Sequence, residues 1–275
     1  MIKQFFNMVA GQKKGLKPSE GLAFYITGGK AYITGLGTCT DSDIVIPTTY
    51  NGYPVIGLSG AGVFASSSIT SIYFPEGFQR FSNEGVKNCS NLTTIYVPST
   101  INSIAVNCFY NCPLLKNVYF NGTPDEYLNL PNVNRMPSSI NTLRYFDGSL
   151  VTDLVVDTAT TIPVNMFYGS STLTTAYLGN SVTTINGDAF AYCSNLVTVD
   201  IGTGITYIGG ETFYNCYALT SLTIRATTPP TFGSLMFGYG SRPNMKIYVP
   251  AESLEAYKTA ANLSQYANQI YAISE

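Results

Sequence analysis

The sequence contains no histidine and no tryptophan among its 275 residues, and only 11% of its residues are charged. Without histidine the chain lacks the commonest general base, the Ser–His and Cys–His nucleophile pairs, and the commonest nitrogen ligand of metals. We therefore expect no enzyme activity, no cofactor and no metal site. The net charge of −2 provides no basic surface for a phosphate backbone, so we expect no nucleic-acid partner.

Long hydrophobic runs are also missing. No segment approaches the roughly 20 apolar residues that a helix needs to cross a bilayer, so we expect no membrane span. In the first 20 residues the apolar cluster comes before the lysines, which is the reverse of the order in a secretory leader, and we expect no signal peptide. The six cysteines of such a chain are expected to be thiols and not a disulfide framework.

A period of 23 residues organises most of what is present. Each repeat reads Phe-x-x-Cys-x-x-Leu-x-x-Ile-x-Ile, followed by a second apolar pair. The last two apolar positions of this unit alternate with polar ones, as expected of a strand with one buried face. The leucine column runs through Ile69, Leu92, Leu115, Leu173, Leu196 and Leu219, and the phenylalanine column through Val63, Val86, Phe109, Phe167, Phe190 and Phe213.

A repeat of this length cannot bury its apolar side alone, but stacked repeats share one continuous core. The sequence therefore predicts a β-rich solenoid of 23-residue coils. Both ends have the patterns of caps. Residues 23–34 alternate around Gly28 and Gly29 as a β-hairpin, and Ala251–Asn262 has an amphipathic helical pattern, followed by a short strand at Ile270–Ile273.

We expect three segments: an N-terminal arm (1–20), the solenoid (21–250) and a C-terminal cap (251–275). The repeat is interrupted at about 121–149, where Leu143, Tyr145 and Phe146 suggest a strand that turns at Asp147 and Gly148. This insertion is either a tolerated surface loop or a binding loop, because insertions in repeat proteins map to one face.

The segment Asn186–Ile201, with Ala-Phe-x-x-Cys-x-x-Leu-x-x-Val-x-Ile within it, resembles the repeat of the BspA-like leucine-rich-repeat family, found in bacterial surface proteins and some phage genomes. Thr38–Pro47 and Tyr248–Lys258 resemble the segments that open and close such arrays. The resemblance covers roughly residues 22–273 and implies a leucine-rich-repeat solenoid with a non-enzymatic binding or adhesion role at a surface.

Two functions follow as expectations. The first is a recognition or adhesion module for a host-surface protein or glycan, at an extracellular or virion surface. The second arises because exported family members begin with a leader: the chain would be a structural part of a phage virion, such as a fibre or decoration protein, with the solenoid as a rigid spacer.

The middle residue of each predicted strand points away from the core, because side chains alternate along a strand. In five repeats this residue is a tyrosine, flanked by hydroxyl or amide side chains. We expect an outward-facing tyrosine ladder that either binds a protein or glycan or only stabilises the sheet by cross-strand pairing. Its members are Tyr73, Tyr96, Tyr119, Tyr177 and Tyr248, with Asp200 and Thr223 in the two strands between the last two.

Four cysteines share one repeat position, where serine occupies two other repeats. Stacked cysteines lie near disulfide and metal-ligand distance, but the exchange with serine and the lack of histidine favour a small buried side chain. They are Cys89, Cys112, Cys193 and Cys216.

The N-terminal arm carries four lysines and one glutamate, a net charge of +3. Its apolar residues have no repeat column to join, so we expect an arm that anchors the chain to other virion proteins or to a second copy of itself. These residues are Ile2, Phe5, Phe6, Met8 and Val9.

Overall fold

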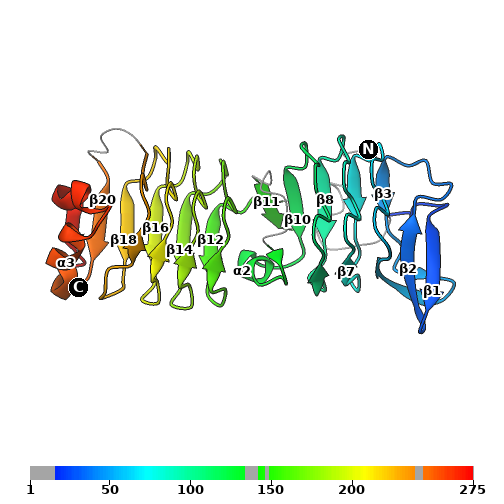
Figure 1. Ribbon diagram of the computed structural model, residues 1–275, viewed down its shortest axis with the longest axis horizontal. Coiled ribbons are helices and arrows are strands. Elements are labelled where there is room, and N and C mark those ends of the chain that lie inside the picture. The colour runs from blue at the N-terminus through cyan, green and yellow to red at the C-terminus, as the bar shows by residue number, and fades with distance from the viewer. Residues whose placement is uncertain (1–15, 134–141, 146–148, 239–243, 275) are drawn as a thin grey trace. The chain divides into compact units, whose positions relative to one another are not determined.

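The chain divides into two compact units, Met1–Leu150 and Val151–Glu275. The computed structural model describes residues 16–133, 142–145, 149–238 and 244–274, with the backbone alone for 142–145. In each unit the chain winds into stacked coils, and one strand of each coil lies beside the equivalent strand of the next (Figure 1). The predicted β-rich leucine-rich-repeat solenoid is confirmed in each unit.

In its described residues, unit 1 contains two sheets on the two sides of its coils. The first has the order β1-β2-β5-β7-β9, with β4 beside β5: β1 (Ala23–Thr27), β2 (Lys30–Gly35), β4 (Thr49–Tyr50), β5 (Tyr53–Leu58), β7 (Arg80–Phe81) and β9 (Ser103–Ile104). The second has the order β11-β10-β8-β6-β3: β3 (Asp43–Val45), β6 (Ser71–Tyr73), β8 (Thr94–Val97), β10 (Asn117–Phe120) and β11 (Thr142–Tyr145).

Unit 2 repeats this arrangement. Its longer strands form the order β12-β14-β16-β18-β20-β21: β12 (Asp153–Val156), β14 (Thr175–Leu178), β16 (Thr198–Ile201), β18 (Ser221–Ile224), β20 (Lys246–Val249) and β21 (Ile270–Ala272). Its short strands form the order β13-β15-β17-β19: β13 (Thr161–Ile162), β15 (Thr184–Ile185), β17 (Tyr207–Ile208) and β19 (Thr231–Phe232).

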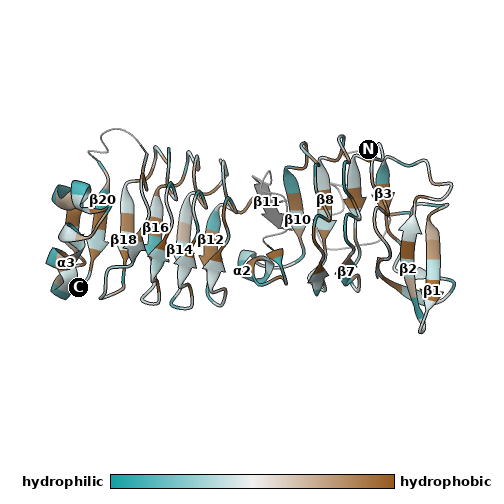
Figure 2. Cartoon of the chain, viewed as in Figure 1, coloured by the Kyte–Doolittle hydropathy of each residue, from teal (hydrophilic) through white to brown (hydrophobic). Residues whose placement is uncertain are grey.

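The parallel register places equivalent residues of successive coils side by side. Val199 of β16 is paired with Leu222 of β18, which is 23 residues later, and both side chains are fully buried. Every member of the predicted leucine and phenylalanine columns is buried. Hydrophobic and hydrophilic bands accordingly alternate along the strands (Figure 2). The shared core that one repeat cannot form alone is built by this stacking.

The turn before each longer strand contains two residues in the left-handed conformation. In one coil of unit 2 they are Asp188 (φ 57°) and Tyr192 (φ 61°), and in the next they are Glu211 and Asn215 (both φ 56°). The turns are also hydrogen-bonded from coil to coil: the Tyr192 amide donates to the Tyr214 carbonyl at 2.7 Å. This edge of the solenoid is therefore as regular as its sheets.

The two ends are closed as the sequence predicts. Strands β1 and β2 form the antiparallel hairpin, and β2 pairs in parallel with β5. At the other end the expected helix over Ala251–Asn262 is shorter: the 3-10 helix η2 (Ala251–Ser253) leads into α3 (Leu254–Thr259), and a second 3-10 helix, η3 (Ser264–Gln269), precedes β21. Tyr257 of α3 is fully buried, and its hydroxyl donates to the Ala226 carbonyl at 2.7 Å.

The interruption of the repeat contains a helix that the sequence analysis did not anticipate, α2 (Pro124–Leu128). It begins with a capping box, in which the side chains of Thr123 and Glu126 each accept a hydrogen bond from the other's backbone amide. The expected strand is present as β11, parallel to β10. The expected turn at Asp147 and Gly148 lies outside the described residues.

Candidate recognition surfaces

Three of the predicted tyrosines lie side by side on the second sheet of unit 1, and we call them the strand row: Tyr73, Tyr96 and Tyr119. The register pairs Tyr73 with Tyr96 and Tyr96 with Tyr119. The rings of Tyr73 and Tyr96 have centroids 5.7 Å apart, and those of Tyr96 and Tyr119 are stacked at 4.5 Å with planes 16° apart. A strand row of aromatic rings in contact was expected, and the structure contains it.

Exposure differs along the strand row. Tyr73 and Tyr96 are half-buried, whereas Tyr119 is only 8% exposed and belongs to the core by this measure. The expectation of an outward-facing contact residue is therefore wrong at Tyr119. Burial, and then the charge of Glu76, raise the pKa of Tyr73, so its hydroxyl stays protonated at neutral pH.

The other two predicted tyrosines lie in unit 2 and do not touch each other. Tyr177 on β14 is 43% exposed, and Tyr248 on β20 is half-buried. Between them Asp200 accepts two hydrogen bonds from the Arg225 guanidinium, at 2.8 Å and 2.7 Å. The five tyrosines are thus not one ladder.

Tyr248 has a different aromatic partner, Tyr271 of β21, with ring centroids 6.3 Å apart. The sequence analysis predicted the strand but not this partner, because β21 follows the helical cap and falls outside the 23-residue phase.

A second aromatic row lies on the turns of unit 2, and we call it the turn row: Tyr168, Tyr192 and Tyr214. Ring centroids are 5.1 Å apart for Tyr168 and Tyr192, and 5.6 Å apart for Tyr192 and Tyr214. Sequence reasoning missed it because the spacings are 24 and 22 residues, which do not match the period. The signal that could have found it is a tyrosine one or two residues after each column phenylalanine.

The cysteine column is a set of buried, free thiols, as expected. Each thiol donates a hydrogen bond to a turn carbonyl of the preceding coil: Cys193 to Phe167 and Cys216 to Phe190, both at 3.0 Å. The hydrogen bond with Cys216, and burial, raise the pKa of Cys193. Such protonated, inaccessible thiols are structural and poor nucleophiles.

The five apolar residues of the N-terminal arm, Ile2, Phe5, Phe6, Met8 and Val9, lie outside the described residues. The anchoring arm at 1–20 therefore stays a prediction.

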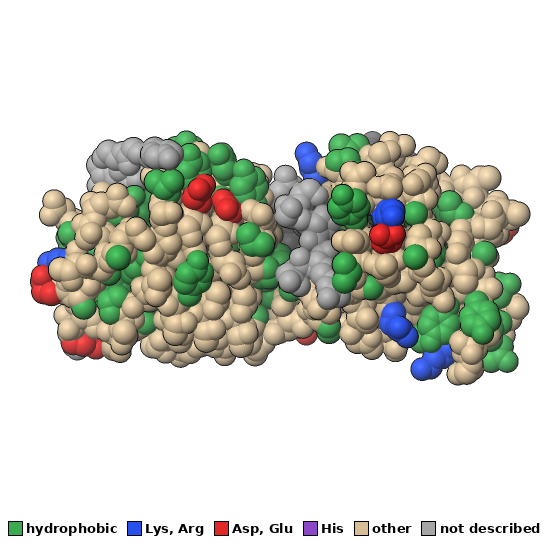
Figure 3. Space-filling model, viewed as in Figure 1, with side chains coloured by type: hydrophobic (Ala, Val, Ile, Leu, Met, Phe, Trp, Pro, Cys, Tyr) green, Lys and Arg blue, Asp and Glu red, His purple; other side chains and the backbone are tan. Residues whose placement is uncertain are grey.

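Neither a metal centre nor a membrane helix is found in the described ranges. Within them, no three or more Cys, Asp or Glu side chains gather as metal ligands. None of the helices in those ranges has the length and hydrophobicity needed to cross a bilayer. The face seen in Figure 3 consists mainly of uncharged polar side chains and backbone, with hydrophobic side chains between them and few charged ones.

Comparison with known proteins gives a family and distant structural neighbours. The family model described as "BspA type Leucine rich repeat region" matches in six copies over residues 56–129 and 138–260. No curated protein matches the chain.

Among solved structures, the chain is similar to a T. pallidum leucine-rich-repeat protein, with 19% identity over 80% of this chain and 87% of that one and a TM-score of 0.39. It is also similar to a leucine-rich cell-surface protein of Faecalibacterium prausnitzii A2-165, with 16% identity over 96% of each chain and a TM-score of 0.33. A third similar structure is the pneumococcal vaccine antigen PcpA, with 13% identity over 95% of this chain and 99% of that one and a TM-score of 0.32.

Proposed function

Because the chain belongs to the BspA-type leucine-rich-repeat family, we propose that it is a non-catalytic recognition module that binds a surface protein or glycan through the strand row of unit 1. The family supports the general role, since its members are surface proteins with binding or adhesion functions. The position of the contact surface is supported by the strand row itself.

The observation that carries this proposal is the stacking of Tyr96 against Tyr119 at 4.5 Å, with Tyr73 on the other side. Rings that are already packed lose little conformational freedom on binding, so their contact area contributes to affinity at low entropic cost. The half-buried side chains of Ser71, Thr94 and Asn117 begin the same strands and offer hydrogen-bonding groups beside the rings.

The proposal is tested by screening the full chain against a glycan array and a panel of extracellular protein domains, and by repeating each positive with variants. Tyr96→Ala is expected to weaken binding by about tenfold or more, as removal of a central aromatic contact does. Tyr96→Phe keeps the ring packing and is expected to retain most of the affinity. The matched control is Tyr217→Ala in unit 2, because Tyr217 is 73% exposed.

Equal binding by the native chain and Tyr96→Ala would remove the strand row as the contact surface. If neither panel yields a ligand, the recognition role fails, and the structural role of a rigid spacer, as in a virion fibre or decoration protein, becomes the better interpretation. Near-UV circular dichroism of each variant checks that its fold is intact.

A further inference from the structure

The turn row of unit 2 is a regular aromatic surface that the proposed strand-row function does not use. Tyr168 and Tyr192 are 37% and 44% exposed, whereas the phenylalanines beside them in the chain, Phe167 and Phe190, are buried. The backbone ladder between turns holds the row in place, with the Gly169 amide donating to the Ala191 carbonyl at 2.7 Å. Tyrosine rings about one coil apart therefore face solvent in a fixed array.

Two carboxylates stand beside the turn row. Asp188 and Glu211 occupy equivalent left-handed positions in successive coils, 23 residues apart. After burial and the contact with Tyr192, the charges of these two carboxylates contribute to raising the pKa of Tyr168. Both carboxylates are therefore close enough to act on the exposed end of this row.

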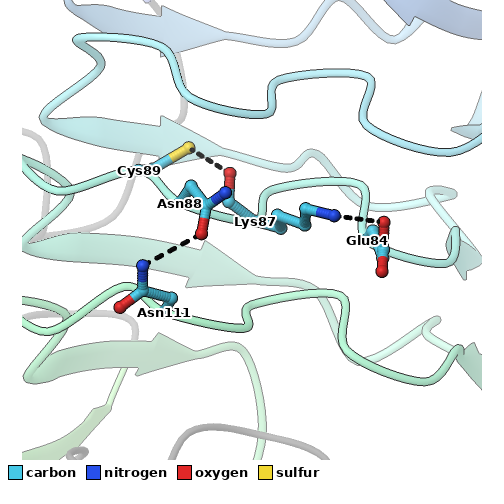
Figure 4. A network of polar contacts seen from close by, with 5 residues as sticks. All are labelled: Glu84, Lys87, Asn88, Cys89 and Asn111. Atoms are coloured by element: carbon cyan, nitrogen blue, oxygen red, sulfur yellow. Dashed lines mark hydrogen bonds and ion pairs between the residues drawn. The ribbon is translucent and has the colours of Figure 1, made fainter.

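In the described residues, neither carboxylate has a cationic partner or a side-chain hydrogen bond. The equivalent turn of unit 1 differs: Glu84, also left-handed at φ 53°, pairs with Lys87 at 2.6 Å (Figure 4). Three residues after Asp188 and Glu211 the chain has Ala191 and Tyr214 instead of lysine. The substitutions that build the turn row thus also remove the cation that neutralises this turn.

The uncompensated charge has a measurable cost. Burial raises the pKa of Asp188, so its ionised form is less well solvated than in water. A cation that approached this edge would recover that cost by an ion pair, and would meet the negative faces of the tyrosine rings at the same time. Both features favour the same kind of ligand.

We propose that the turn row, with Asp188 and Glu211, binds an arginine-containing segment of a protein partner, whose guanidinium groups lie over the rings and pair with the carboxylates. Arginine fits better than lysine because its planar group stacks on aromatic faces and pairs with a carboxylate through two hydrogen bonds. An extended peptide presents side chains on one side about every 7 Å, which is comparable to the 5.1 Å and 5.6 Å between neighbouring rings.

This surface is in unit 2 and the strand row is in unit 1, so the two proposals stand or fall separately. The test uses the full chain and a fluorescein-labelled peptide of four Arg-Gly repeats, with four Gln-Gly repeats as the uncharged probe. Fluorescence anisotropy is measured at about 50 and 150 mM salt, because ion pairs at a partly exposed site weaken with salt.

The double variant Asp188→Asn/Glu211→Gln is expected to bind the arginine peptide at least about fivefold more weakly than the native chain. Its matched control is Asp157→Asn/Glu252→Gln, which removes the same two charges from exposed positions of unit 2 and is expected to stay within about twofold of native binding. Tyr168→Ala is expected to weaken binding by about threefold or more, while Tyr168→Phe retains it because the ring remains.

Equal weakening by the two double variants would show only a general attraction between an acidic chain and a basic peptide, and would overturn the site. No binding of the arginine peptide by the native chain, or equal binding of the glutamine peptide, would overturn it as well. A melting temperature for each variant at or above that of the native chain shows that a loss of binding is not a loss of fold.

Discussion

Replacing Phe190 by alanine tests the stacking on which the whole fold rests. Phe190 is fully buried in unit 2 and lies between two other column phenylalanines. Its ring centroid is 5.3 Å from that of Phe167 and 5.7 Å from that of Phe213, with planes only 15° and 16° apart. The substitution therefore removes the centre of a continuous stack through three coils.

The expected loss follows from burial and from the two ring contacts. Truncating a buried phenylalanine to alanine costs about 3–5 kcal/mol, because apolar contact is lost and a cavity remains. The coils above and below are held by backbone hydrogen bonds on both sides, such as that from the Phe190 amide to the Thr212 carbonyl at 3.0 Å, so they cannot collapse into the cavity. We therefore expect a value toward the upper end, about 4–5 kcal/mol.

Urea unfolding of Phe190→Ala, followed by near-UV circular dichroism, measures this loss as a lower midpoint. Hydrogen exchange of peptides from β14, β16 and β18 shows whether the destabilisation is in unit 2. Phe190→Leu, which refills most of the volume, is the matched control and is expected to lose less than about 1.5 kcal/mol. A loss below about 1 kcal/mol for Phe190→Ala would refute the inference that the phenylalanine column holds the coils together.

Two further variants test the thiol column and the unpaired carboxylates. Cys216→Ser is expected to leave stability within about 1 kcal/mol of native, because serine keeps a donor for the Phe190 carbonyl, whereas Cys216→Val lacks one and should cost about 1 kcal/mol in urea unfolding; equal values for the two would contradict a role for the hydrogen bond. Asp188→Asn should raise the melting temperature at pH 7 and have a smaller effect near pH 3. The pKa of Asp188 is raised in the fold, so the native chain loses stability as pH rises through that pKa, and a pH-independent effect would contradict this origin.

The coil and its core could be predicted from the sequence because both depend on a period. Residues 23 apart must occupy equivalent places once the coils stack, so the spacing alone was enough to assign Phe190 and Leu196 to the core. The same argument placed Tyr73 and Tyr96 on the outer side of neighbouring strands, where the structure has them. The hairpin at Ala23–Gly35 was also predictable, from alternation around two glycines.

Alternation along a strand tells which side a residue faces but not how much of it is covered. Tyr119 faces the same side as Tyr96, yet its neighbours leave it 8% exposed, and no local pattern distinguishes the two. The helix α2 was missed for a related reason, since five residues are too few to show a helical period and its capping box alone marked it.

By itself, then, the sequence determined the period, the identity of the buried columns and the caps that close the ends, because these follow from local alternation and a fixed repeat. The tertiary structure alone decided the division at Leu150 and Val151, the cover over Tyr119 and the turn row beside Asp188. These depend on left-handed turns and on contacts between coils, in which residues at unequal spacings come together, and such contacts leave no periodic trace in the chain.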